Sequence, residues 1–336
     1  MQISVLDQSP IKSGVSPAES IRESLVLARE CERFGYHRYW LSEHHNTDSV
    51  AGSAPEILIA AIAATTSRIR VGAAGIMLPH YSALKVAEQF KVLEAIAPGR
   101  IDLGLGRAPG SDGRTAFALN PNAARASDMF PTQVRDLMAW GTGAALPAEH
   151  PFREIICQPQ GPTSAEVWIL GSSTYGAQLA GYFGLPYCYA HFFTDGEGTE
   201  EALDAYRRSF TPSAILAQPH AAIVVAALAA DTLEEAEYWY RSRAVAWALR
   251  GRGKFLPLQT PEDAEKVELT EVERARMAAA RERAFIGAAP EVTERLRALS
   301  ARLGLDELVI TTGTTSPASR IRSYELFARE FGLGGI

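Results

Sequence analysis

Three titratable side chains, Glu43, His44 and His45, follow Ser42 at the end of a short apolar segment at 38–41 that is typical of a buried strand. In parallel α/β folds, active sites are built where the strands reach their carboxyl ends. Adjacent histidines are a weak metal signal, because neighbouring strand residues point to opposite faces. Either ring could instead be a hydrogen-bonded rim residue, and the pattern taken alone favours that ordinary role over a functional one.

Two further histidines stand beyond expected strands. His80 follows Pro79 after an expected strand at 71–78, and His191 follows an expected strand at 187–190. Both are placed to face the same edge of the sheet and to contact a substrate. An ordinary rim position fits each of them equally well.

Short apolar or β-branched runs alternate with helix-like segments, which predicts a parallel sheet covered by helices. Eight strands indicate a closed (β/α)8 barrel of the TIM type rather than an open sheet, and 336 residues suit a single barrel domain over 1–336. Long connections near 106–127 and 251–285 are expected as insertions at the C-terminal face of the strands, the second with a charge-rich helical pattern at 261–283. The expected strands are 3–6, 38–41, 71–78, 101–105, 167–170, 187–190, 222–228 and 308–312.

Composition narrows the class of protein. With 47% hydrophobic and 21% charged residues the chain has the balance of a soluble globular protein, and its net charge of −6 argues against nucleic acid or acidic lipid as partners. No apolar run reaches the length of a membrane span and no secretory leader is recognisable, so we expect a cytoplasmic protein. Cys31, Cys157 and Cys188 are widely spaced, which predicts neither a disulfide framework nor a thiolate metal site.

Several motifs in this order and spacing resemble the bacterial luciferase-like family of flavin-dependent monooxygenases. The resemblance extends over nearly the whole chain, and each motif is loose when taken alone. The matching segments are 34–36, 39–45, 71–79 with 87–89, 99–107, 169–173 and 306–312.

The resemblance implies a function. Members of this family bind reduced FMN, supplied by a separate flavin reductase, at the mouth of the barrel. They act on paired donors with incorporation of oxygen, oxidising a small organic substrate through a peroxyflavin. Such chemistry needs water to be excluded and a group that handles a proton near neutral pH, for which His44 is the first candidate and His45 the second.

The cofactor residues follow from the same resemblance. Gly171, Ser172 and Ser173 stand between a strand and a helix start, where free amides and hydroxyls suit a phosphate, although Ser173 could simply cap its own helix. Arg107 is placed against the same phosphate, with an ion pair to Asp102 or another acid as its alternative. Tyr175 is expected to stack near the phosphate or ribityl tail, or to pack its helix on the barrel.

Two positions are expected beside the flavin ring. The resemblance places the Glu43 carboxylate beneath the ring or its polar tail, and a structural glutamate bonded to backbone is nearly as consistent with the sequence. It also places a bulge with a non-prolyl cis peptide between Ala74 and Gly75. Small residues that only permit close packing are the alternative there.

Other functions stay open on the sequence alone. A deazaflavin-dependent hydride-transfer oxidoreductase would use the same fold, and a non-catalytic flavin-binding protein would keep the cofactor site. A metal-dependent barrel hydrolase would need ligands from several strand ends, and no metal site is predicted. Family resemblance also implies a homodimer.

Overall fold

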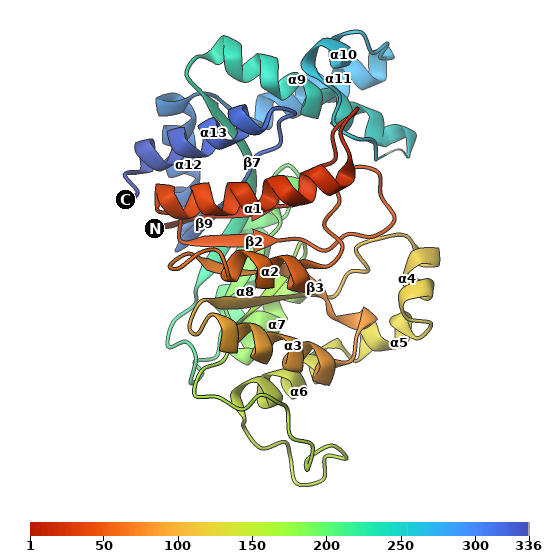
Figure 1. Ribbon diagram of the computed structural model, residues 1–336, viewed down its shortest axis with the longest axis vertical. Coiled ribbons are helices and arrows are strands. Elements are labelled where there is room, and N and C mark those ends of the chain that lie inside the picture. Colours follow the sequence, from red (N-terminus) through yellow and green to blue (C-terminus); the bar gives the residue numbers. More distant parts are fainter. Residues whose placement is uncertain (254, 335–336) are drawn as a thin grey trace.

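The computed structural model describes residues 1–253 and 255–334, and its centre is a closed barrel of eight parallel strands (Figure 1). Neighbouring strands follow the order of the chain, and β6–β7 and β1–β9 pairings complete the ring. The predicted (β/α)8 barrel is confirmed. The barrel strands are β1 (Gln2–Asp7), β2 (Arg38–Leu41), β3 (Arg70–Met77), β4 (Ile101–Gly106), β5 (Glu166–Gly171), β6 (Tyr187–Tyr189), β7 (Ala221–Ala230) and β9 (Glu307–Thr311).

Helices cover the outside of the barrel because each presents an apolar stripe to it. In α1 (Pro17–Phe34) the stripe includes Leu27, Cys31 and Phe34. Ser16 caps the start of this helix, its hydroxyl accepting from the Ala18 amide, and Gly35 with φ of 87° caps its end. The other covering helices are α2 (Pro55–Ala63), α3 (Ala83–Ile96), α6 (Phe130–Thr142), α7 (Thr174–Phe183), α8 (Thr199–Ser209), α9 (Leu233–Leu249), α12 (Ala289–Leu303) and α13 (Pro317–Phe331).

Both connections predicted as long loops contain regular structure. The first holds two short helices, α4 (Gly113–Leu119) and α5 (Ala123–Asp128), and the second holds α10 (Pro261–Glu265) and α11 (Glu271–Arg283). Thr270 begins α11 with a capping box closed by Glu273, which explains how so polar a segment stays helical. Figure 1 shows α9, α10 and α11 together at one end of the long axis, with α6 toward the other.

The sequence analysis missed one strand, β8 (Phe285–Ala288). It pairs with the second half of β7, from Ala227 to Ala230, beyond the point where β7 leaves β9. Its four residues follow a charged helix and carry no alternation, so no strand signal separates them from the preceding segment.

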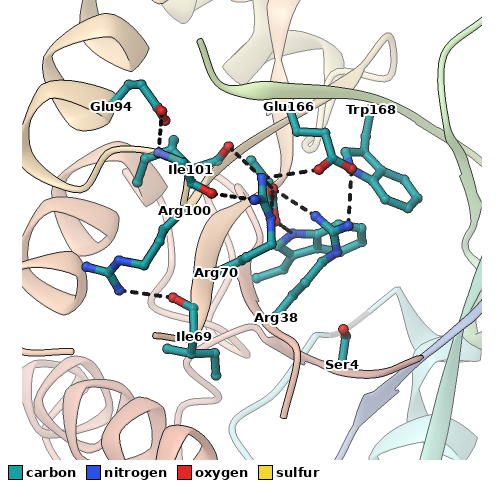
Figure 2. Close-up of polar contacts among 12 residues, drawn as sticks. Ser4, Arg38, Ile69, Arg70, Glu94, Arg100, Ile101, Glu166 and Trp168 are labelled. Atoms are coloured by element: carbon teal, nitrogen blue, oxygen red, sulfur yellow. Dashed lines mark hydrogen bonds and ion pairs between the residues drawn. The ribbon is translucent and has the colours of Figure 1, made fainter. Parts of the chain in front are cut away.

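Charged side chains fill the barrel interior near the amino-terminal ends of the strands. The guanidinium of Arg38 lies 2.8 Å from Asp102, 3.1 Å from Glu166 and 3.1 Å from Glu307, and Arg70 also reaches Asp102 and Glu166. Figure 2 shows the two arginines converging on Glu166. Burial would raise the pKa of Glu307, but contacts with His220, Arg38 and Ser4 outweigh it and lower that pKa to about 2.

An aromatic layer lies above these charges. The rings of Trp40 and Trp168 meet edge to face with centroids 5.0 Å apart, and the Trp40 indole donates to Asp102 at 2.9 Å. Together with Leu6, Val224 and other apolar residues they fill the middle of the barrel. The carboxyl ends of the strands are thereby left as the open end of the barrel.

The three cysteines are buried free thiols. Within the described part of the chain, no helix is both long and apolar enough to cross a bilayer.

Replacing Arg38 by alanine should lower the free energy of unfolding by about 3–5 kcal/mol, because the substitution leaves buried carboxylates without their paired cation. Urea denaturation of the purified variant measures this loss. As a matched control, Arg22→Ala removes an exposed arginine paired with Glu19 and should cost less than about 1 kcal/mol. Similar losses in the two variants would contradict the role assigned to Arg38.

Candidate active site

A cavity of about 290 Å³ opens at the carboxyl ends of the strands. It brings together residues that are far apart in the chain, from Leu6 on β1 to Val224 on β7. The predicted residues that line it are Glu43, His44, Ala74, Gly75, Arg107, Gly171, Ser172, Ser173 and Tyr175. Most of the predicted site is therefore one continuous surface.

One end of the cavity has the chemistry of an anion site. Ser173 is the N-cap residue of α7, but its side chain makes no capping hydrogen bond, so the hydroxyl and the first amides of the helix remain available for a ligand. The Arg107 guanidinium lies 3.9 Å from the centroid of the Tyr175 ring, which holds it over the same helix start. Asp102, the acid considered for Arg107, is instead paired with Arg38 and Arg70.

The peptide bond between Ala74 and Gly75 is cis, as predicted. The pairing of β3 with β4 shifts register between Ala73 and Ile76, so a bulge lies there too. A Cβ on Gly75 would lie 2.6 Å from the carbonyl oxygen of Gly104, so only glycine fits this close approach of the strands. Backbone from β3 thus forms a wall of the cavity.

Glu43 fastens two strand ends to each other. Its carboxylate accepts from the Met77 amide at 2.9 Å and from the Tyr81 hydroxyl at 2.8 Å, and lies 2.7 Å from Nε2 of His45. Burial raises the pKa of Tyr81, and the Glu43 charge raises it further. These contacts give Glu43 the structural role left open in the sequence analysis, while it also faces the cavity.

His44 is the histidine of the predicted set that lines this cavity. Its Nδ1 lies 3.2 Å from the Ser42 hydroxyl, and its side chain lines the cavity. Burial lowers the pKa of His44 below its ordinary value; the charge of Glu43 opposes the shift and that of Arg250 adds to it. The imidazole is therefore neutral at neutral pH and able to accept a proton.

The other predicted histidines lie apart from this cavity. Among the residues that the structure describes, neither His45 nor His80 lines the cavity. Their rings pack together at 6.0 Å between centroids, and His80 Nε2 is held by the Pro109 carbonyl at 2.7 Å. His191 lines a neighbouring cleft, with Nδ1 2.9 Å from the Thr199 hydroxyl, and burial lowers its pKa to about 4.

Comparison with known sequences identifies the family. Residues 1–307 match the family model described as luciferase-like monooxygenase. The chain belongs to this family. A luciferase-like monooxygenase of Escherichia coli K12 is 38% identical over 96% of this chain and 95% of its own length. The N-acetyl-S-alkylcysteine monooxygenase of Bacillus subtilis is 35% identical over 98% and 97% respectively.

Solved structures of the family have the same fold. Apo-MsnO8 superposes with a TM-score of 0.90 at 34% identity, over 100% of this chain and 99% of its own. At lower identity the likeness concerns the fold alone. The oxygenating constituent of 3,6-diketocamphane monooxygenase of Pseudomonas putida, solved with FMN, has a TM-score of 0.70 at 19% identity, covering 98% and 97%. An F420-dependent secondary alcohol dehydrogenase has a TM-score of 0.62 at 13%, covering 96% and 97%.

Sequence reasoning missed part of the mouth. Gln8 at the end of β1 lines the main cavity and the cleft next to it, and the α9 residues Arg243 and Trp247 line two such clefts. A detectable signal existed, since positions 243, 247 and 250 lie on one face at helical spacing.

In the part of the chain that the structure describes, no group of three or more His, Cys, Asp or Glu side chains is arranged to hold a metal ion.

Replacing Glu43 by glutamine should lower the pKa of His44 further, because the carboxylate charge favours the protonated imidazole. Arg250→Gln should shift the same pKa upward, since that guanidinium disfavours protonation. NMR titration of the His44 ring, assigned with a His44→Asn variant, measures both shifts. Shifts of the same sign in the two variants would contradict this electrostatic account.

Proposed function

We propose that this chain is a flavin-dependent monooxygenase that uses reduced FMN and molecular oxygen to oxidise a small organic substrate. The observation that carries the proposal is a single cavity with an anion site at Arg107 and Ser173 and a neutral histidine, His44, on the same lining. A separate flavin reductase is the proposed source of reduced FMN. Gly104-Leu105-Gly106 lacks the third glycine of a nicotinamide-binding fingerprint, so the sequence offers no such site of its own.

The residues at the helix start fit the phosphate of FMN. Ser172, Ser173 and the first amides of α7 offer hydrogen-bond donors, and the planar fork of Arg107 matches phosphate oxygens. The backbone at Ala74 and Gly75 offers a flat wall without bulky side chains for the ring system. When bound, reduced FMN supplies the electrons with which oxygen is activated.

The protein contributes proton handling and exclusion of water. His44 Nε2 is the atom that can take up or return a proton, because Nδ1 is directed to the Ser42 hydroxyl. Met77, Phe192 and Phe193 supply apolar lining on the same cavity. Removing water there strengthens every electrostatic contact made by His44 and protects a reactive oxygen species from side reactions.

The choice of cofactor rests on the more similar relatives. The fold accommodates both FMN and a deazaflavin, as the complexes of the two more distant enzymes show for those proteins. The Escherichia coli and Bacillus subtilis relatives described above exceed 30% identity and are named monooxygenases, the second of them for N-acetyl-S-alkylcysteines. We therefore place FMN first and the deazaflavin-dependent hydride transfer second. The homodimer implied by family resemblance is part of the same proposal and is tested by sedimentation.

Anaerobic titration with reduced FMN, followed by mixing with ¹⁸O₂ and N-acetyl-S-methyl-L-cysteine as first probe substrate, tests the reaction. The expected result is tight binding and one labelled oxygen atom in the product. No binding of reduced FMN would contradict the flavin function. Binding without incorporation, together with tighter binding of deazaflavin, would favour hydride transfer.

Replacing Arg107 by alanine should weaken FMN binding at least tenfold, because a hydrogen bond to a charged group contributes about 1.5–3 kcal/mol. Riboflavin lacks the phosphate and should bind the variant and the parent protein equally. Fluorescence titration measures both affinities. Equal weakening for the two ligands would place Arg107 away from the phosphate.

Replacing His44 by alanine should leave FMN affinity unchanged and reduce coupled product formation by about 10²–10⁴-fold, because the proton-handling group is lost. Stopped-flow rates and the yield of hydrogen peroxide measure the uncoupling. His150→Ala is the matched control, since His150 pairs with Asp136 outside the cavity. If flavin oxidation stayed fully coupled to product formation in the His44 variant, the proton-handling role proposed for His44 would be wrong.

A further inference from the structure

Two narrow clefts of about 50 and 80 Å³ extend the main cavity toward α9, and Arg243 lines both of them. Phe192 is shared between the main cavity and the first cleft, and Gln8 between the main cavity and the second. The clefts therefore adjoin the candidate active site, with Phe192 and Gln8 at the boundaries. The ends of β7 and β9 form their floor, across the barrel from the ends of β4 and β5, where the phosphate subsite is proposed.

Arg243 is a half-buried cation without a carboxylate of its own. Burial lowers its pKa, and interactions with Tyr240 and Asp195 oppose that shift. Within residues 1–253 and 255–334 its guanidinium makes neither an ion pair nor a hydrogen bond. An unpaired guanidinium that has lost part of its hydration and lines a cleft is a candidate for binding an opposite charge.

Arg250 adds a second cation to the same place. Its guanidinium lies 4.4 Å from the centroid of the Trp247 ring and lines the second cleft. Burial and the charge of Arg243 lower the pKa of Arg250 to about 10, and the Arg250 charge also acts on His44. Like Arg243, it has no ion-pair partner among the described residues. Both cations thus line the second cleft, with Arg250 at its exposed side, and Arg250 lies close enough to His44 to act on its pKa.

The nearby acids are already paired. Asp195 is bound by Arg283 at 3.0 Å, and Asp7 by Arg320 at 2.7 Å. Glu43 is committed to Met77, Tyr81 and His45, as described above. These clefts therefore carry an excess of positive charge in a chain whose net charge is −6, and the excess is not a general property of the surface.

We propose that Arg243 and Arg250 bind a carboxylate of the substrate at the α9 side of the mouth, while the apolar part of the substrate lies toward Phe192. The inference rests on the proposed oxygenase function, because it gives the substrate class for that same cavity. The forked guanidinium groups match the two oxygens of a carboxylate. Trp247 and Phe285 supply apolar surface in the first cleft, which Arg243 also lines.

The test compares benzoate with benzamide, which have nearly the same size and shape and differ in charge. Calorimetric titration uses the full chain saturated with FMN, so that the phosphate subsite is filled. We expect benzoate to bind at least tenfold more tightly than benzamide. Arg243→Gln and Arg250→Gln should each reduce that ratio strongly, and the double variant should bring it close to one without changing FMN affinity.

Arg241→Gln is the matched control, since Arg241 lies on the same helix but is paired with Glu265 at 2.9 Å. It should retain the full preference for benzoate. A ratio near one in the parent protein, including no binding by either compound, would overturn the proposal, as would a preference that survives in the double variant. If the variants lose affinity for FMN instead, the two arginines bind the cofactor rather than the substrate, and the proposal is wrong.

Failure of this inference is distinguishable from failure of the proposed function. Titrating the chain with FMN alone tests the flavin function, and titrating it with benzoate in the absence of FMN tests the arginine pair. If the protein prefers benzoate to benzamide but does not bind FMN, the carboxylate site is supported and the oxygenase function is contradicted. If it binds FMN but does not prefer benzoate to benzamide, the FMN site is supported and the carboxylate site is contradicted.

Discussion

Charge neutralisation inside the barrel is the constraint on which the rest of this structure depends. Arg38 on β2 is held by carboxylates from β4, β5 and β9, so a single guanidinium ties together strands that are distant in sequence. A buried arginine of this kind is tolerable only when every partner is in place. The arrangement fixes the relative positions of the strands at the bottom of the barrel, and their carboxyl ends are fixed with them (Figure 2).

Above this network, the close approach of β3 and β4 shapes the cavity. Gly75 and Gly104 lie where a Cβ would collide with the neighbouring strand, so the two backbones come together without intervening side chains. The bulge at Ala73–Ile76 turns peptide groups toward the mouth. Glu43 then joins the end of β2 to the end of β3 through the Met77 amide. Stability and site geometry depend here on the same contacts.

The mouth is electrostatically uneven. Arg107 and the start of α7 form a positive region near β4 and β5, and Arg243 with Arg250 forms another near β7 and β9. A neutral His44 lines the cavity between these two regions. This separation would allow the proposed phosphate site and the proposed carboxylate site to be filled at the same time, because the two anions would not compete for one cation.

The sequence by itself determined the barrel and most of its strands, because apolar runs and turn residues are local signals that are readable wherever they occur. The cis peptide at Ala74-Gly75 and the predicted residues that line the cavity came from the resemblance of motifs at strand ends to a known family. Only the tertiary structure separated His44 from His45, because two adjacent ring directions depend on what Glu43 and Ser42 contact across strands. It alone also revealed β8 and the isolation of Arg243, since a missing partner is a property of three-dimensional packing and leaves no mark on neighbouring residues in the chain.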